Sequence, residues 1–256
     1  MKISVIVITK NEEANIERCL SSVSWADEIV VVDSQSSDRT VEIARAYGAR
    51  VIETTNWPGF GPQKNRALAQ AGGEWVLSLD ADERVTLELR EEIVAIVSGG
   101  AEFDAYAIPR LSRYCGRFMR HGGWWPDYVT RLFRRGKARF SDDLVHEKLI
   151  AGGRTGRLKS HLVHFAFEDF EEVLRKVDQY STASARMLFA RGRTGSLSKA
   201  VFHAFWTFFR TYVLRAGFLD GSHGFMLAVS NAEGTYYRYA KLRLLAQAEA
   251  ERLRRG

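Results

Sequence analysis

The sequence contains little cysteine. Its 256 residues include only Cys19 and Cys115, which excludes a disulfide framework and a zinc site built from thiolates. Such usage fits a protein of the reducing cytoplasm. Cys19 shares the spacing of one helix face with Ile16, Leu20 and Val23, so we expect its thiol in the core.

Long apolar runs are also absent. The apolar part of the N-terminal stretch MKISVIVITKNEE is too short for a signal peptide, and no small-residue cleavage site follows it. The most apolar helical stretch, KAVFHAFWTFFRTYVLR, has ten residues between Lys199 and Arg210. Because a membrane span needs about 20 predominantly apolar residues, we expect no transmembrane helix.

Two common nucleotide-binding motifs are missing. No Gly-x-Gly-x-x-Gly follows the first apolar strand, which disfavours a dinucleotide-binding fold of the usual kind. No Gly-Lys-Ser/Thr phosphate loop is present either. Internal repeats and low-complexity linkers are lacking as well, so the chain does not have the pattern of a repeat protein.

Charge is unevenly distributed along the chain. Hydrophobic residues make up 46% of the sequence and charged residues 27%, as in a folded globular protein. Residues 1–110 hold 11 Lys and Arg against 18 Asp and Glu, a net charge of −7, whereas residues 111–256 hold 26 against 13, a net charge of +13. The second part therefore suits an anionic partner. Charge alone leaves open nucleic acid, an anionic membrane surface, a phosphorylated substrate and a plain solvated surface.

The first 110 residues alternate between strand and helix patterns. Apolar, β-branched runs predict strands at 3–9, 28–33, 49–54 and 74–80, with helices between them. Fully apolar strands separated by helices indicate a mainly parallel sheet covered on both faces, and right-handed crossovers make it a doubly wound α/β fold. Ligands of such sheets bind beyond the carboxyl ends of the strands.

Further strands are expected within 105–165, followed by long helices at 168–191, 198–216 and 229–254. The second of these helices is amphipathic, because Lys199, His203 and Arg210 share one face. Its other side carries five large apolar residues: Phe202, Phe205, Trp206, Phe209 and Val213. Such a helix suits a membrane interface, and packing of the aromatic side against the core is an equal alternative.

Polar or acidic residues end three of the predicted strands. They are Thr9-Lys10-Asn11, Asp33-Ser34 and Asp80-Ala81-Asp82. Alternate side chains on an extended chain point to opposite sides, so Asp80 and Asp82 reach one ion only if the chain turns between them. Mg²⁺ and Mn²⁺ use a few carboxylates together with substrate phosphates, which favours metal-assisted handling of a diphosphate. The alternative is an acidic cluster at the start of the next helix.

Three stretches within residues 3–83 carry a family resemblance. They read SVIVITKNEEANIERCLSSV, ADEIVVVDSQSSDRTVEIA and QKNRALAQAGGEWVLSLDADE. Together they resemble the nucleotide-sugar domain of family 2 inverting glycosyltransferases of the GT-A fold. The branch that they resemble most is that of bacterial lipopolysaccharide-core β-glucosyltransferases, which VHEKL (145–149) and YVLRAGFLDGSHGFMLA also resemble.

The resemblance implies a GT-A type α/β fold with a mainly parallel mixed sheet and a C-terminal helical region. It places a glycosyltransferase domain at 1–165, with a nucleotide-sugar half at 1–104 and an acceptor half at 105–165. A helical region at 166–256 follows and is a candidate for membrane association.

A donor site with a divalent metal, Mg²⁺ or Mn²⁺, is implied as well. The donor-binding residues would be Thr9, Asn11, Glu12, Asp33, Lys64 and Asp80. Asp33 would bind the uracil or ribose, Asp80 the ribose side, and Asp82 the metal between the two phosphates. Lys64 could equally be a solvated lysine, and His164 either a second metal ligand or a structural histidine.

The catalytic base is expected downstream of Asp-x-Asp. We assign it to Glu147 in LVHEKL, where the resemblance places an acidic motif, with Asp142 and Asp143 as alternatives. The candidates for acceptor binding are Trp124, Trp125, Asp127 and Arg131. Paired tryptophans suit sugar stacking and arginine suits phosphate, although the tryptophans could equally belong to the core.

The sequence therefore predicts a metal-dependent inverting enzyme that moves a sugar, with glucose expected, from a UDP-sugar to a glycolipid such as the lipopolysaccharide inner core. We expect it in the cytoplasm, peripheral on the inner face of the inner membrane, bound to an anionic surface and without a nucleic-acid partner. One alternative is a transferase for polyprenyl phosphate or another cell-envelope polysaccharide intermediate. A non-catalytic nucleotide- or membrane-binding protein is a third, which the intact set Asp33, Asp80, Asp82 and Glu147 argues against.

Overall fold

The chain forms two compact units. The computed structural model describes residues 2–141 and 148–255. The first unit comprises Met1–Leu111 and Asp127–His164, and the second comprises Ser112–Pro126 and Phe165–Gly256. The division expected after residue 165 lies beside one unit boundary. The segment 112–126, which we expected in the acceptor half, groups with the C-terminal helices instead.

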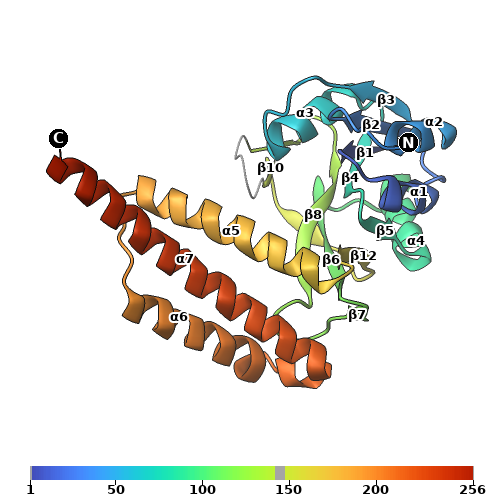
Figure 1. Ribbon diagram of the computed structural model, residues 1–256. Coiled ribbons are helices and arrows are strands. Elements are labelled where there is room, and N and C mark those ends of the chain that lie inside the picture. The colour runs from blue at the N-terminus through green and yellow to red at the C-terminus, as the bar shows by residue number, and fades with distance from the viewer. Residues whose placement is uncertain (1, 142–147, 256) are drawn as a thin grey trace. The chain divides into compact units, whose positions relative to one another are not determined.

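Four parallel strands form one side of a sheet that has ten strands among the described residues (Figure 1). They are β1 (Ile3–Thr9), β2 (Glu28–Asp33), β3 (Arg50–Glu53) and β4 (Trp75–Asp80), in the spatial order β3-β2-β1-β4. Their β-branched side chains are stiff and pack well on a pleated, buried surface. Thr9 lies opposite Asp33 and Ile8 opposite Asp80, so the carboxyl ends of β1, β2 and β4 meet at one edge.

Antiparallel pairing extends the sheet beyond β4. The next strands are β8 (Asp127–Arg134), β6 (Ala105–Tyr114), β12 (Leu162–Phe167) and β5 (Glu83–Val85). The short strands β7 (Arg117–Phe118) and β11 (Thr155–Arg157) pair with β6 in the same sheet, whereas β9 (Ala138–Phe140) and β10 (Leu149–Ala151) pair with each other in a second, two-stranded sheet. β8 is antiparallel to β4 and β6, and β12 is antiparallel to β5. The sequence did not predict β5, because its three residues follow an acidic turn that reads as a helix start.

Helices cover both faces of the parallel half. The helices are α1 (Glu13–Ser21), α2 (Thr40–Ala46), α3 (Phe60–Gln70) and α4 (Leu87–Ala95), the last followed by a π-helical turn (Ile96–Gly100). Alternate residues of β1 enter two different cores: Val5 packs with Cys19 of α1, whereas Ile6 packs with Ala67 of α3. The helix face predicted around Cys19 is confirmed, because Ile16, Cys19, Leu20 and Val23 are all fully buried.

The second unit is mainly helical. Its helices are α5 (Phe170–Ala190), α6 (Leu197–Phe209) and α7 (Gly221–Arg255), with a π-helical turn (Arg210–Leu214) and a 3-10 turn (Gly217–Asp220) before α7. Asp169 and Ser196 cap α5 and α6 by accepting backbone hydrogen bonds at 2.7 and 3.2 Å. α7 lies beside both α5 and α6 (Figure 1). Within residues 2–141 and 148–255, no helix has the length and apolarity that a membrane span requires.

The predicted architecture is confirmed: a mixed α/β sheet with a parallel first half and a helical C-terminal region. The parallel half places the polar strand ends that the sequence singled out at a common edge.

Candidate active site

The segment Asp80-Ala81-Asp82-Glu83 turns at the carboxyl end of β4. β4 ends at Asp80, residues 81 and 82 form a turn, and β5 begins at Glu83. Glu83 is fully buried, and its Oε2 accepts a hydrogen bond from the Asp80 backbone N–H at 3.0 Å. The turn lets the Asp80 and Asp82 carboxylates meet different partners.

Two cations hold Asp80 in place. Lys64 of α3 approaches Oδ1 with its Nζ at 2.8 Å, and Arg131 of β8 donates to Oδ2. Burial alone would raise the pKa of Asp80, but the positive charges of Arg131 and Lys64 outweigh it and hold this pKa well below its ordinary value. Asp80 therefore stays ionised. Lys64 has a side chain that is 2% exposed, which excludes the alternative of a solvated lysine.

Glu83 links Asp80 to a neighbouring ion pair. Its Oε1 accepts hydrogen bonds from Arg131 at 2.6 Å and from Arg110 at 3.3 Å. Arg110 of β6 also donates to Asp127 of β8 at 2.5 Å, directly across the two strands. We call these six residues the ion network: Lys64, Arg110 and Arg131 with Asp80, Glu83 and Asp127. Three cations thus match three carboxylates.

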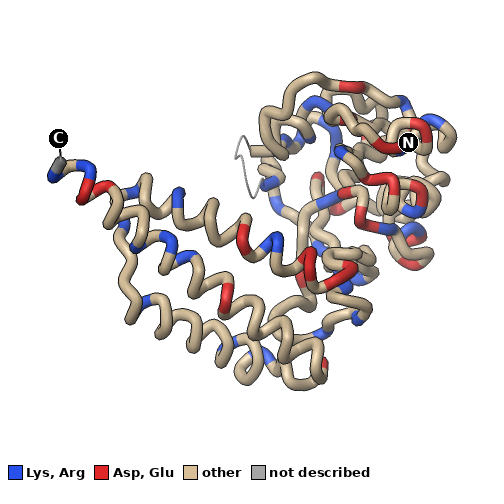
Figure 2. The backbone as a smooth tube through the Cα atoms, in the orientation of Figure 1, with Lys and Arg blue, Asp and Glu red and all other residues tan. Residues whose placement is uncertain are grey.

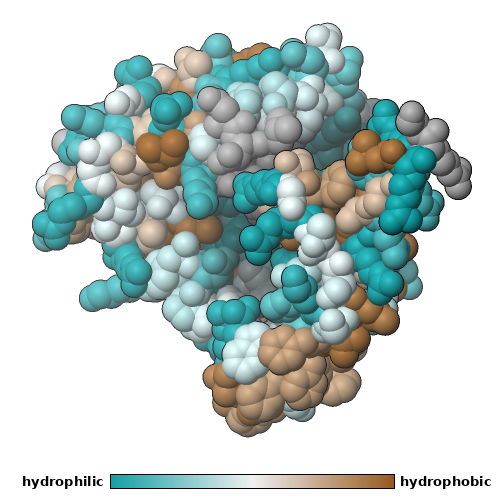
Figure 3. All heavy atoms as spheres, turned by 90° about the vertical axis from the view of Figure 1, so that its left-hand side faces the viewer, coloured by the Kyte–Doolittle hydropathy of each residue, from teal (hydrophilic) through white to brown (hydrophobic). Residues whose placement is uncertain are grey.

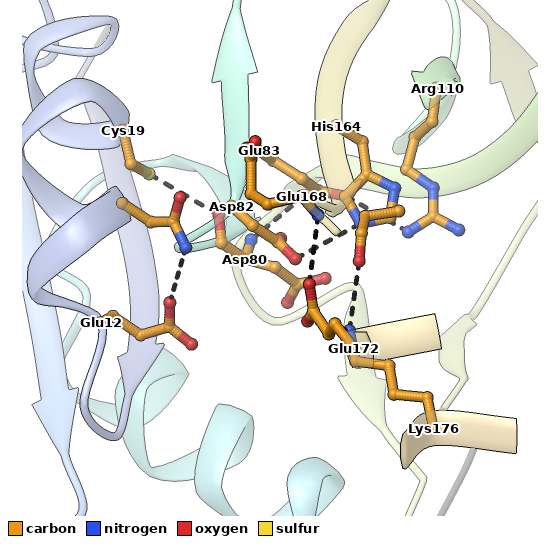
Figure 4. A network of polar contacts seen from close by, with 12 residues as sticks. Glu12, Cys19, Asp80, Asp82, Glu83, Arg110, His164, Glu168, Glu172 and Lys176 are labelled. Atoms are coloured by element: carbon orange, nitrogen blue, oxygen red, sulfur yellow. Dashed lines mark hydrogen bonds and ion pairs between the residues drawn. The ribbon is translucent and has the colours of Figure 1, made fainter. Parts of the chain in front are cut away.

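Asp82 lies beside His164 of β12. Its Oδ2 is 3.4 Å from His164 Nε2, while its Oδ1 is buried and has no hydrogen-bond partner among residues 2–141 and 148–255 (Figure 4). A buried polar atom without a partner is costly unless a ligand satisfies it. Carboxylate and imidazole together suit a divalent cation that keeps other positions for phosphate or water. No group of three potential metal ligands occurs among the described residues, so these residues alone do not form a complete cage.

Comparison with known proteins decides the family. The sequence model described as "Glycosyl transferase family 2" matches residues 4–160. The chain belongs to glycosyltransferase family 2. It is 32% identical over 257 residues to an uncharacterized glycosyltransferase of Rickettsia typhi, covering 96% of this chain and 88% of the relative. It is also 30% identical over 253 residues to the lipopolysaccharide core biosynthesis glycosyltransferase LpsC of Rhizobium meliloti, covering 94% and 92%.

The fold agrees with this family. The crystal structure of Staphylococcus aureus TarS 1–349 in complex with UDP-GlcNAc matches the chain with a TM-score of 0.52 at 18% identity. The match covers 97% of this chain and 92% of that chain. The predicted family 2 membership, the GT-A type fold and the assignment as an enzyme are therefore confirmed.

The family 2 fold gathers four of the predicted donor residues at the ends of β1 and β2: Thr9, Asn11, Glu12 and Asp33. Thr9 Oγ1 donates to the fully buried Asp33 carboxylate at 2.8 Å, and Ser36 donates to it from its backbone and its side chain. Asn11 has a left-handed φ of 56°, and its Oδ1 accepts the Ser37 backbone N–H at 2.8 Å. These bonds fix the loop after β1 against the loop after β2.

The predicted acceptor residues of this glycosyltransferase are divided between the units. Trp124 and Trp125 belong to the second unit, and Asp127 and Arg131 belong to the first. Trp124 packs edge-on against Tyr114, with ring centroids 5.6 Å apart, and is stacked on Phe167 at 6.1 Å. Arg131 is buried in the ion network, so the anion that its guanidinium meets in this structure is the protein's own Asp80 and Glu83.

The assignment of the base concerns residues outside the described part of the chain. Glu147 and both of its alternatives, Asp142 and Asp143, fall within 142–147. Glu147 therefore stays a prediction.

Sequence reasoning missed the roles of Glu83 and Arg110. Glu83 was visible as the third carboxylate of WVLSLDADE, but its partners Arg110 and Arg131 lie 27 and 48 positions further along the chain. Only the pairing of β4 with β8 and of β8 with β6 brings these residues together.

Cys19 borders the same strand end. Its thiol donates a weak hydrogen bond to the Asp80 carbonyl oxygen at 3.6 Å. Burial raises the pKa of the Cys19 thiol far above its ordinary value, and the negative charges of Glu83 and Asp82 raise it further. Cys19 is consequently a neutral core residue and not a nucleophile.

Proposed function

We propose that this glycosyltransferase transfers glucose from UDP-glucose to a glycolipid acceptor of the lipopolysaccharide inner core. The transfer would invert the configuration of the anomeric carbon. LpsC, which is similar over nearly the whole chain, is named for lipopolysaccharide core biosynthesis, and TarS binds UDP-GlcNAc. The observation that carries the proposal is the buried, unpartnered Oδ1 of Asp82 beside His164. It lies after a parallel strand, where α/β sheets bind their ligands.

Asp82 and His164 would hold a divalent metal, Mg²⁺ or Mn²⁺. When bound, such an ion supplies positive charge that stabilises the departing diphosphate. The nearby cations Lys64 and Arg131 are already paired with carboxylates of the protein. We therefore assign them a positioning role: they keep Asp80 ionised and fixed, ready to accept a hydrogen bond from the ribose side of the donor.

The loops after β1 and β2 would receive the nucleoside. Asp33 is the proposed partner of the uracil or ribose, and Thr9 and Ser36 orient its carboxylate. Asn11 and Glu12 complete this side of the donor site. The hydrogen bonds between the two loops support the assignment, because a pre-organised site loses less entropy when the donor binds.

Inversion requires a base on the acceptor side. Glu147 would take the proton of the acceptor hydroxyl as that oxygen attacks the anomeric carbon, while UDP leaves from the opposite face. Trp124 and Trp125 would offer aromatic faces to the acceptor sugar. A lipid-linked acceptor places this reaction at the inner face of the inner membrane, which the net positive charge of residues 111–256 supports.

Calorimetry of UDP binding, with and without Mn²⁺, tests the donor site. We expect Mn²⁺ to strengthen UDP binding by the wild type and to have no effect on Asp82→Asn. Asp104→Asn is the matched control, since this carboxylate is 44% exposed and pairs with Arg134 away from the network. An unchanged Mn²⁺ effect in Asp82→Asn would remove the metal from this site.

Mass spectrometry of cell-envelope glycolipids tests the acceptor. Cells that lack the protein should lose one hexose from the lipopolysaccharide core, and expression of the wild type should restore it. A missing sugar on a polyprenyl phosphate intermediate, with an intact core, would instead favour the alternative acceptor.

A further inference from the structure

The aromatic side of α6 faces outward. Phe202, Phe205 and Trp206 are 64%, 67% and 45% exposed, so these three rings are not part of the core of the second unit. α6 packs on α7 through its other side, where Ala200 is fully buried and Thr207 hydrogen-bonds Thr235 at 3.3 Å. Figure 3 shows hydrophobic side chains gathered at the lower edge of the view, the level at which α6 lies in Figure 1. An exposed group of aromatic side chains of this kind marks a binding surface.

A basic cavity lies at the beginning of the same helix. It measures about 450 Å³ and is bounded by Arg193, Lys199 and His203, together with Thr194 and Tyr239. The His203 ring stacks on Tyr239 with centroids 4.7 Å apart, which fixes the imidazole in the wall. No Asp or Glu belongs to the described lining. The cavity therefore offers cationic and hydroxyl donors but no acidic group.

Two cations of this cavity have no carboxylate partner in the described part of the chain. Among the described residues, no carboxylate lies within 4.0 Å of Arg193 or Lys199. The sequence from 179 to 219 contains six Lys and Arg and no Asp or Glu, and Figure 2 shows blue without red along α6. In the ion network of the first unit, by contrast, each cation has a carboxylate partner. Unpaired cations around a hollow attract an anion from outside the chain.

We propose that this cavity binds the phosphate group of an anionic membrane lipid while the aromatic side of α6 enters the interface. Arg193 and Lys199 supply charged donors to the phosphate oxygens, as lysine and arginine commonly do. Phe202 follows Lys199 by one helical turn, so the apolar and phosphate-binding groups border each other on one helix. A lipid offers phosphate and hydrocarbon side by side, whereas a soluble phosphate leaves the exposed aromatic rings without a partner.

Co-sedimentation of the full chain with vesicles tests the proposal. We expect stronger binding to phosphatidylcholine vesicles that contain phosphatidylglycerol than to phosphatidylcholine alone. Each cation near an anionic surface contributes about fivefold in affinity, so Arg193→Gln/Lys199→Gln should weaken binding roughly 30-fold. The control is Arg175→Gln/Arg252→Gln, which removes the same charge from two exposed arginines that do not line the cavity. Equal losses in both double variants would overturn the proposal, because they would show diffuse attraction without a site.

A soluble probe distinguishes a lipid from a free phosphate. Glycerol phosphate should compete with vesicles for the wild type more strongly than chloride at equal ionic strength. Phe202→Ser/Phe205→Ser should weaken vesicle binding and leave the affinity for glycerol phosphate unchanged. Binding of glycerol phosphate without any binding of vesicles would overturn the lipid assignment. Mn²⁺-dependent UDP binding, measured in the same variants, reports on the donor site separately, so a failure here leaves the proposed sugar transfer intact.

Discussion

Replacing Glu83 by Gln should destabilise the first unit far more than a loss of one carboxylate at the surface would. The Glu83 side chain is fully buried; one oxygen meets Arg131 and Arg110, and the other accepts the Asp80 backbone N–H. A glutamine has one oxygen and one amino group in these two places. Whichever way the amide turns, its NH₂ faces a donor, and the negative charge between two guanidinium groups is lost.

The loss of stability in Glu83→Gln depends on which ion pairs of the network remain. Removal of one partner from a buried ion pair costs about 3–5 kcal/mol. Arg131 keeps its bond to Asp80 and Arg110 keeps its bond to Asp127, so we expect the lower end, about 3 kcal/mol. For a protein of this size, that lowers the melting temperature by roughly 6–12 °C.

Thermal unfolding followed by circular dichroism measures this effect. Glu42→Gln is the control, because its pair with Arg39 joins side chains that are 68% and 63% exposed and should contribute nothing measurable. A double-mutant cycle between Glu83→Gln and Arg131→Gln should show a coupling of about 1 kcal/mol or more. If Glu83→Gln melts at the temperature of the wild type, the ion network does not stabilise the strand ends and the reasoning above is wrong.

Three further predictions use the same unit. The pKa of Asp80 is depressed in the folded state, so its contribution to stability is complete above the unfolded pKa of about 3.9 and declines as the pH falls below it. Asp80→Asn should therefore have a lower free energy of unfolding than the wild type at neutral pH. Urea titrations should show that this difference shrinks below about pH 4. Glu147→Gln should lower turnover by roughly 10²–10⁴-fold and retain the affinity for the UDP-sugar, whereas Asp143→Asn should lower turnover much less. If Asp143→Asn lowers turnover more than Glu147→Gln, the catalytic base is not Glu147. Gly73→Ala should lower the melting temperature, because an added Cβ at Gly73 would lie 2.7 Å from the Ser4 backbone nitrogen. Gly72→Ala should not lower it, because the nearest neighbour of an added Cβ at Gly72 is a Glu28 side-chain oxygen at 3.5 Å.

Local patterns predicted the strands of the parallel half well. ISVIVIT and EIVVVD form β1 and β2 over the predicted residues, because buried parallel strands need unbroken apolar runs that few other elements contain. The start of α7 was predicted at 229 and lies at Gly221. FLDGSHGF reads as a turn, yet Gly224 lies inside α7. Glycine is required at this position because an added Cβ would collide with the Gly217 carbonyl oxygen. In the sequence, such a close approach between two backbone segments is indicated only by the glycine.

The site could be predicted only where it depends on strand ends. Asp33, Asp80 and Asp82 follow from the rule that ligands bind beyond the carboxyl ends of parallel strands. The contact of Asp82 with His164 required the resemblance to a family, because 82 positions separate the two residues and a backbone pairing of β5 with β12 joins them. The outward face of α6 could not be chosen from the sequence, since an amphipathic pattern fits both a core and an interface.

The carboxylates of the candidate site fall into two groups, according to whether a Lys or Arg of the chain is paired with them. Asp80, Glu83 and Asp127 each have a Lys or Arg partner that is part of the chain, whereas Asp82 faces the imidazole of His164. A Lys or Arg beside Asp82 would neutralise its carboxylate whether or not the donor is bound. The carboxylate would then have no net charge with which to attract a divalent ion. An imidazole differs from ammonium and guanidinium because it can bind a metal in its neutral form. The matched pairs thus hold the ends of β4, β6 and β8 together, and under the proposed function the fourth carboxylate, Asp82, would be available for the divalent metal.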